Sequence, residues 1–228
     1  MEQITPAKCN RSLTLLLDRL LADTGFSQKR IGRLQRKTKE CEQFALFYFT
    51  RERERCGYHY SLTMNLGFRF ADVDKLTSEF QNEDYAASLG TAILPLYTLL
   101  PDPGVSFRKY DDYCAEEPLD GFAEMLSKDF REYALPFYEK YDTLHKLEAY
   151  LDDALRTTKR GTALDGPRLC ICRSRRGGGY YSCFAAVLCV LGEYEKCRRA
   201  LEETAFPEGE VKERIIGYLS ERGQVKKR

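Results

Sequence analysis

Arginines and glycines gather just before an apolar segment toward the C-terminal end of the chain, in the sequence RSRRGGG. The residues concerned are Arg173, Arg175, Arg176, Gly177, Gly178 and Gly179. A helix that begins after this loop would direct its free N–H groups and the positive end of its dipole toward an anion. The P-loop pattern G-x-x-x-x-G-K-[ST] is absent, and three glycines in a row also suit a turn without a ligand. The loop is therefore a candidate site for an anion or an acidic partner, with a structural turn as the alternative.

Cysteines in the same stretch raise the question of a metal site. Cys170 and Cys172 form one close pair, whereas structural zinc sites usually contain two such pairs. Cys183 and Cys189 lie about 240° apart around a helix, so they would not face one ion. Cys197 is expected to be a small buried residue between two packed helices. We predict no metal ligands and no cofactor.

A second row of polar side chains belongs to a segment of strict alternation, YHYSLTMNLGFRF. Such alternation predicts a strand with one buried face and one polar face. The polar face comprises His59, Ser61, Thr63, Asn65 and Arg69. His59 and Ser61 would stand about 7 Å apart, which prevents nucleophile–base contact with ordinary rotamers. The row is a candidate polar surface, and no catalytic residue is predicted.

Periodicity predicts the elements that would carry these residues. Leucines at one-turn spacing predict an amphipathic helix over residues 8–23, which Gly25 can terminate. The segments RIGRLQRK and CEQFALFYFT are rich in branched and aromatic residues and predict strands. Together with the alternating segment, they predict a curved antiparallel sheet of about four to five strands, packed by helices.

The next segments show helical spacing. Asp72 offers an N-cap for a helix over residues 73–80, and Asp142 offers one for a helix that extends to Leu155. A helical pattern between them should bend or stop near Pro136, because proline lacks an N–H and its ring clashes in a helix interior.

The sequence predicts an α+β fold and two parts. An α+β domain is expected over residues 1–155 and a helical C-terminal extension over residues 156–228, which either packs on the first part as one domain or stands apart. Within the extension, YYSCFAAVLCVLGEYEKCRRALEETAFP resembles a single tetratricopeptide-like helical hairpin. A last helix is predicted over about residues 208–220.

Charge is balanced overall but segregated along the chain. The 228 residues carry a formal net charge of +1, so no global field draws the protein to nucleic acid or to a membrane. Residues 29–39 contain six basic and no acidic side chains, and residues 111–124 contain six acidic and no basic ones. The first interpretation is a set of solvated faces, and the alternative is a basic sheet edge that meets an acidic partner or a nucleic-acid backbone.

The compartment is inferred from the cysteines and from the apolar runs. The nine cysteines are odd in number and scattered, and the first residues lack the apolar run of a secretory signal, which together favour a cytoplasmic location. The longest apolar runs are shorter than the roughly 20 residues that cross a bilayer, so no membrane association is predicted.

Four segments in a fixed order carry a family likeness: LLADTGFSQKRIGRLQRK, QFALFYFT, YHYSLTMNLGFRFADVDKL and ALPFYEKYDTLHKLEAYL. Over about residues 8–155 they resemble a family of bacterial domains of unknown function, number 4304 in that series. The resemblance implies an α+β fold with a curved antiparallel sheet and no assigned catalytic residues. Some members resemble companions of bacterial toxin systems, which implies an immunity-like or accessory role.

These observations favour a non-enzymatic bacterial protein that binds another protein. One alternative is an anion-binding or nucleotide-binding protein, or an enzyme, that uses the loop over residues 173–179. Another is a nucleic-acid binder that uses the basic region 29–39, with Tyr58 or Tyr60 stacking on bases. The alternation directs those tyrosines toward the core, so nucleic acid is not expected as a partner.

Overall fold

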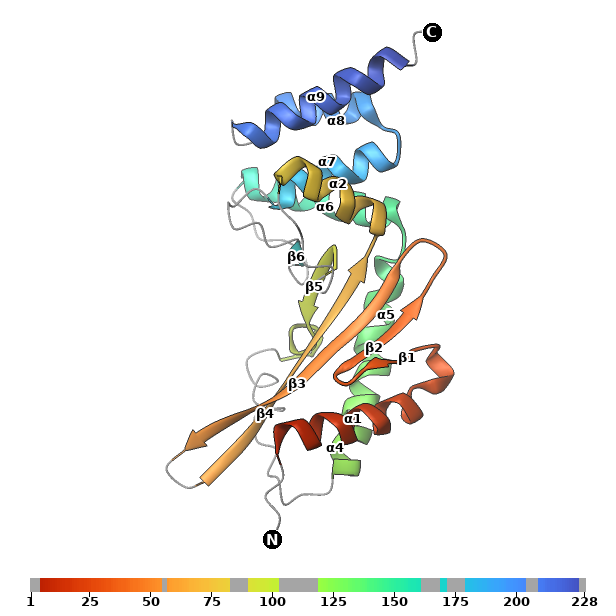
Figure 1. Cartoon of the computed structure of the whole chain (residues 1–228), viewed down its shortest axis with the longest axis vertical. Coiled ribbons are helices and arrows are strands. Elements are labelled where there is room, and N and C mark those ends of the chain that lie inside the picture. The colour runs from red at the N-terminus through yellow and green to blue at the C-terminus, as the bar shows by residue number, and fades with distance from the viewer. Residues whose placement is uncertain are drawn as a thin grey trace. The chain divides into compact units, whose positions relative to one another are not determined.

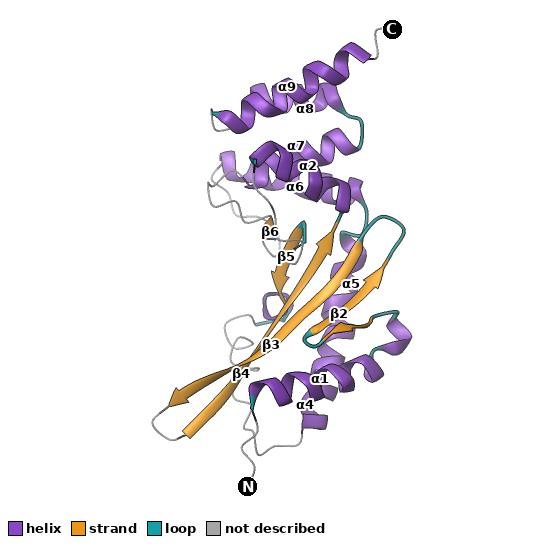
Figure 2. Ribbon diagram, viewed as in Figure 1, coloured by secondary structure: helices purple, strands orange, loops and turns teal. Residues whose placement is uncertain are grey.

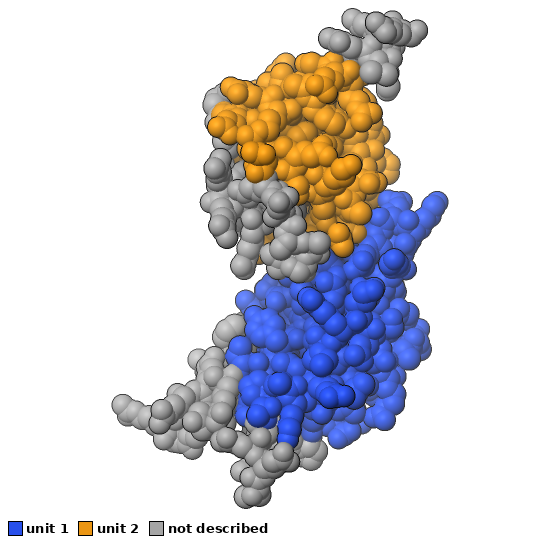
Figure 3. Space-filling view, viewed as in Figure 1, with its two compact units in different colours: residues 1–68, 93–140 blue, residues 69–92, 141–228 orange. Residues whose placement is uncertain are grey.

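The chain folds into two compact units, each built from two stretches of sequence. The computed structural model describes residues 5–54, 57–82, 90–102, 119–160, 169–171, 179–203 and 209–225. The first unit contains residues 1–68 and 93–140, and the second contains residues 69–92 and 141–228 (Figure 3). The boundary predicted between residues 155 and 156 lies within one helix of the second unit, α6 (Leu144–Arg160).

The first unit is built on an antiparallel sheet, and the α+β class predicted from the sequence is confirmed. Its strands follow one another in chain order across the sheet (Figure 2). They are β1 (Ser27–Arg30), β2 (Arg33–Lys37), β3 (Glu42–Glu54), β4 (Gly57–Arg69) and β5 (Ala92–Pro95). The predicted strand RIGRLQRK is in fact the tight turn of the β1–β2 hairpin followed by β2, because Gly32, with a φ of 72°, reverses the chain.

Strand β4 shows the two faces that its alternation predicted. Tyr60, Leu62, Met64, Leu66 and Phe68 are buried in the core. The intervening residues Ser61, Thr63 and Asn65 are half-buried. Strand β2 pairs only with residues 42–46 of β3, so β3 extends beyond the end of β2.

The first unit also contains helix α1 (Pro6–Leu20) and two short 3-10 turns. Helix α1 is capped by Thr5, begins two residues before the predicted start and buries Leu13 and Leu17. A 3-10 turn, η1 (Ala22–Thr24), follows it and is closed by Gly25, which has a φ of 77°. A second 3-10 turn, η2 (Leu96–Leu99), follows β5.

Aromatic rings from the sheet and from the helical segment 119–140 meet at one residue, Tyr138. The ring centroid of Tyr138 lies 5.1 Å from that of Phe26 and 5.3 Å from that of Phe68. Its hydroxyl donates to the carbonyl oxygen of Phe44 at 2.6 Å. The buried phenol therefore contributes both apolar area and a satisfied hydrogen bond to the core.

The helical segment 119–140 does not stop at Pro136. Helix α4 (Leu119–Asp129) leads through a π-helical turn, η3 (Phe130–Ala134), into α5 (Leu135–Lys140), and the three follow one another along the sheet (Figure 1). The Leu135 N–H bonds to the Phe130 carbonyl, five residues back. This wider turn directly before Pro136 relaxes the hydrogen-bond register, so the helix passes the proline instead of ending there.

The second unit is helical in its described residues, apart from the two-residue strand β6 (Cys170–Ile171). Its other elements are α2 (Ala71–Gln81), α6, α7 (Gly179–Val190), α8 (Tyr194–Glu203) and α9 (Glu210–Val225). Helix α7 is apolar on nearly every side because α2, α6 and α8 pack around it. The predicted α7–α8 hairpin is present, and Cys197 is 1% exposed, with its sulfur 3.9 Å from the Ala185 carbonyl oxygen.

Two predicted helix caps are wrong. Phe70 occupies the N-cap position of α2, so Asp72 lies inside the first turn, where its charge favours the positive end of the helix. At α6, the Thr143 hydroxyl accepts from Lys146 N at 3.3 Å, and Asp142 instead pairs with the Lys146 ammonium at 2.8 Å. Asp72 therefore lies where its charge favours the helix dipole, whereas Asp142 pairs with a side chain one turn along α6.

Candidate interaction surface of the first unit

Among the described residues of the first unit, three large apolar side chains are exposed, one from each of three segments. Leu15 of α1 is 57% exposed, Ile31 of the β1–β2 turn is 54% exposed and Tyr48 of β3 is 47% exposed. Single exposed apolar residues are common and need no explanation, but a group of them marks a binding surface. The question is whether the backbone brings these three together.

Hydrogen bonds between their immediate neighbours bring the backbones of the three residues close together. The Gly32 N–H donates to the Thr14 hydroxyl at 2.9 Å, and the Phe47 N–H donates to the Gly32 carbonyl at 2.9 Å. Leu15, Ile31 and Tyr48 are each one residue away from these bonded residues. We call this region, together with the cations described next, the α1–hairpin surface.

Four cations accompany the apolar residues. Arg11 and Arg19 lie four residues before and after Leu15, hence on the same helical face, and both are exposed. Lys29 and Arg30 directly precede Ile31 and are also exposed. None of the four forms an ion pair with any described residue of the chain. The α1–hairpin surface therefore combines apolar area with cations that form no ion pair with a described residue.

The edge strand β1 is not open to a further strand. Asp18 of α1 accepts a hydrogen bond from Gln28 N at 2.6 Å, and so occupies a backbone donor of this strand. The pairing of β1 with β2 is also irregular between Gln28 and Arg30. Natural sheets protect their edges in this way, with bulges and charged side chains. Recognition at the α1–hairpin surface would therefore use side chains rather than strand addition.

Two arginines of the basic region 29–39 have structural roles. The Arg33 guanidinium stacks on the Phe44 ring, 4.6 Å from its centroid, and bonds to Glu42 at 2.7 Å. Arg36 stacks 4.9 Å from the Phe26 centroid and donates to the Thr24 carbonyl and to Gln43. Both side chains therefore stabilise the sheet, and the row of cations predicted from the sequence is interrupted.

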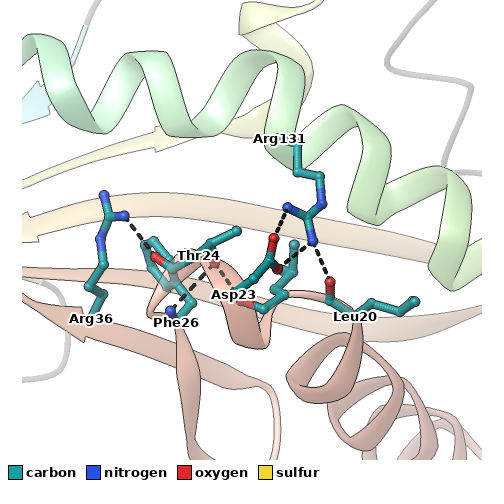
Figure 4. Close-up of polar contacts among 7 residues, drawn as sticks. Leu20, Asp23, Thr24, Phe26, Arg36 and Arg131 are labelled. Carbon is teal, nitrogen blue, oxygen red and sulfur yellow. Dashed lines mark hydrogen bonds and ion pairs between the residues drawn. The ribbon is translucent and has the colours of Figure 1, made fainter.

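Arg131 ties α4 and η3 to the end of α1 (Figure 4). Its guanidinium donates to both carboxylate oxygens of Asp23, at 2.9 and 2.6 Å, and to the Leu20 carbonyl at 2.6 Å. The hydrogen bond from Arg131 holds the pKa of Asp23 below its usual value. A shallow surface pocket of about 420 Å³ lies beside this contact, lined by Leu20, Glu124, Ser127, Lys128, Arg131 and Glu132. Its lining carries charges of both signs, so it selects no ligand class.

The predicted polar face of the alternating strand is divided. Ser61, Thr63 and Asn65 lie on the half-buried face of β4 in the first unit. Arg69 belongs to the second unit, where its Nε lies 3.5 Å from Asp74 Oδ2. The side chain of His59 lies outside the described residues. The structure therefore brings no nucleophile and base together among the described members of the row.

The arginine and glycine loop lies almost entirely outside the described residues. Arg173, Arg175, Arg176, Gly177 and Gly178 are not described, and Gly179 is the first residue of α7. Among the described cysteines, Cys170 is exposed and Cys9, Cys41, Cys183, Cys189 and Cys197 are buried. Within the described ranges, no group of three or more His, Cys, Asp or Glu side chains is arranged to hold a metal ion.

Sequence reasoning missed the three apolar residues of the α1–hairpin surface, although part of the signal was present. Leu15 lies about 200° around the helix from Leu13 and Leu17, on the side opposite the buried stripe. Tyr48 alternates with the buried Phe47 and Phe49. Each residue alone is unremarkable, so only the tertiary contacts reveal the group.

No family model, curated protein or solved structure matches the chain. Among the described residues, no helix has the length and apolar character that crossing a membrane requires.

Proposed function

We propose that this protein is a non-enzymatic interaction protein that binds an acidic protein partner through the α1–hairpin surface. The observation that carries the proposal is the grouping of Leu15, Ile31 and Tyr48 beside four cations that pair with no described residue. A protein partner can bury the apolar side chains and supply carboxylates to the cations in one interface.

The same surface favours a protein over a nucleic acid. A nucleic-acid backbone would be served by a continuous row of cations, whereas Arg33 and Arg36 are bound within the sheet. Tyr60, an expected stacking residue, is 2% exposed. Two aliphatic side chains, Leu15 and Ile31, contribute to apolar contact but offer no stacking surface to a base.

The finer proposal is an immunity-like or accessory role in a bacterial toxin system, and it rests on the resemblance over residues 8–155. A cytoplasmic location fits the six free cysteines of the described residues, five of which are buried thiols. Products of neighbouring genes are the first partners to test. If none of them binds the protein, the immunity-like role is contradicted, while the interaction surface can still be tested by crosslinking.

A photo-crosslinking amino acid in place of Ile31 tests the surface directly in cells. We expect a discrete crosslinked species that contains an acidic protein. The control carries the same amino acid in place of Ile216, a residue of the second unit that is 47% exposed. Equal crosslinking at the two positions would contradict the proposal, because it would show that exposure alone explains the contact.

With a purified partner, the apolar and charged contributions can be separated by calorimetry. The variant L15S/I31S/Y48S should weaken binding by roughly 100-fold or more, since a few truncated anchors at about 1–2 kcal/mol each dominate most interfaces. I216S is its matched control. Charge reversal by R11E/R30E should weaken binding and flatten its salt dependence. The control K75E/R199E, at exposed positions of the second unit, should change neither the affinity nor its salt dependence.

A further inference from the structure

A buried carboxylate in the second unit joins the first turn of α2 to the residue before β5. Asp74 Oδ1 accepts a hydrogen bond from the Thr91 hydroxyl, and the Thr91 oxygen accepts from the Phe70 N–H at 2.8 Å. Arg69 Nε lies 3.5 Å from the other oxygen, Asp74 Oδ2. The contacts run Phe70 N–H to Thr91, Thr91 to Asp74, and Asp74 to Arg69.

Burial makes this carboxylate easier to protonate than an ordinary aspartate. The Asp74 side chain is 17% exposed, and Thr91 is fully buried. Burial raises the pKa of Asp74 to about 6, although the Thr91 hydroxyl and the Arg69 charge both act to lower it. Burial therefore destabilises the charged carboxylate more than the Thr91 hydrogen bond and the Arg69 charge stabilise it.

Few other charges of the described residues bear on Asp74. On α2 itself, Asp72 and Lys75 are exposed to solvent. Helix α7, which packs against α2, contributes the uncharged Ser182 to a contact with Gln81. Helix α9 contributes Arg214, which donates to the Phe80 carbonyl at the far end of α2. Arg69 is thus the charged group that faces the carboxylate.

The tie between Arg69 and Asp74 depends on charge. Arg69 Nε is buried and makes no hydrogen bond of good geometry in the structure, so its attraction to Asp74 is that of an ion pair at 3.5 Å. The Thr91 contact differs, because an uncharged carboxyl oxygen also accepts a hydrogen bond. Loss of the charge would therefore break one contact and preserve the other.

We propose that Asp74, Thr91 and Arg69 form a proton-operated latch at the start of α2. When one solvent proton adds to Asp74 Oδ2, the carboxylate becomes a neutral acid, and its new O–H points at a guanidinium that can only donate. Arg69, whose side chain is 34% exposed, then turns to solvent. Thr91 stays bound to Oδ1 and keeps the Phe70 N–H satisfied.

The latch changes one end of α2 while the other end stays fixed. At its C-terminal end, α2 is held by the Phe80 ring, 5.6 Å from the Tyr218 centroid, and by Arg214 on the Phe80 carbonyl. Protonation therefore adds an exposed cation beside the first turn of α2 without removing the contacts of its last turn. The latch is independent of the α1–hairpin surface, which belongs to the first unit.

The wild-type protein provides the first test, by NMR across pH 7.5 to pH 5. We expect the Asp74 carboxyl carbon to titrate with a midpoint near 6. The Arg69 Nε–H should shift and exchange faster with water along the same curve. No midpoint within this range, as expected for an aspartate with the ordinary pKa of 3.8, would overturn the proposal, and so would an Arg69 signal that stays unchanged while Asp74 titrates.

Variants separate the latch from other titrations in the same range. D74N imitates the neutral acid, keeps an acceptor for Thr91, and should show the released Arg69 signal at every pH. Its melting temperature should be higher than that of wild type at pH 7.5, and the difference should shrink toward pH 5. D72N, an exposed neighbour in the same turn, is the control and should behave as wild type. An Arg69 signal in D74N that equals that of ionised wild type would also overturn the proposal.

Discussion

Gly32 and Phe47 approach one another more closely than any residue with a side chain would allow. A Cβ atom on Gly32 would lie 2.6 Å from the Phe47 carbonyl oxygen, and Gly32 has a φ of +72°. The same glycine donates to Thr14 and accepts from Phe47. The turn that carries Ile31 thus depends on a glycine that joins α1, the β1–β2 hairpin and β3.

The first prediction follows from this close approach. Gly32→Ala should destabilise the fold by about 2–4 kcal/mol, because it adds both a positive-φ penalty and a backbone clash. The loss can be measured by urea unfolding. Gly217→Ala in α9 is the control, since nothing lies within 4 Å of its added Cβ. That change should be neutral or stabilise by about 0.5–1 kcal/mol, as alanine favours a helix. Equal losses in the two variants would contradict the argument.

The second prediction concerns the Tyr138 hydroxyl. Tyr138→Phe should cost about 1–2 kcal/mol, because the buried Phe44 carbonyl loses its donor while the ring remains. Burial raises the pKa of Tyr138 well above its usual value of 10.0. Its contribution is therefore complete below pH 10 and declines as pH rises further, when the unfolded chain ionises first. The free energy of unfolding should be measured at pH 8 and above pH 10. The difference between wild type and Tyr138→Phe should be smaller at the higher pH. A constant gap would contradict a buried, protonated phenol.

The third prediction ranks the two partners of the Arg131 contact. Arg131→Met should lower the melting temperature more than Asp23→Asn, because Arg131 also bonds to the Leu20 carbonyl at the end of α1. The pKa of Asp23 is lowered, so its contribution to the stability of the fold is present at neutral pH and is lost as pH falls below 3.8. Thermal unfolding of both variants at pH 7 checks the order. The reverse order would contradict a stabilising role for the Leu20 contact, because Arg131→Met removes that contact together with the ion pair.

The fourth prediction concerns thiol reactivity. Of the six described cysteines, Cys170 is exposed and should be alkylated first in the native protein. Burial raises the pKa of the Cys9 thiol, and contact with Cys197 together with burial raises the pKa of Cys189, so both should react only on unfolding. Mass spectrometry of briefly labelled protein locates the modified residues. Native labelling of Cys189 ahead of Cys170 would contradict the packing of the α7–α8 hairpin.

Local pattern predicted the elements well where one face of an element is buried. The alternation in β4 and the apolar stripe of α1 gave the correct structure, because each buries every second residue or every helical turn. The segment 119–140 shows where local rules are insufficient. Proline rules predicted that the helix bends or stops near Pro136; it does not stop there, because a π-helical turn directly before the proline accommodates the residue. The caps at Asp72 and Asp142 were mistaken because a charge near a helix start can act without a capping hydrogen bond.

The candidate site was less predictable than the fold, and the reason is distance along the chain. The sequence by itself determined which side of the amphipathic elements is apolar, and therefore strands β3 and β4, the helices and the burial of Cys197. Only the tertiary structure decided which exposed residues meet. Thr14 bonds to Gly32, 18 positions away, and Asp74 bonds to Thr91, 17 positions away. Periodicity is a property of a few consecutive residues, whereas these contacts depend on how separate elements pack, so no local pattern encodes them.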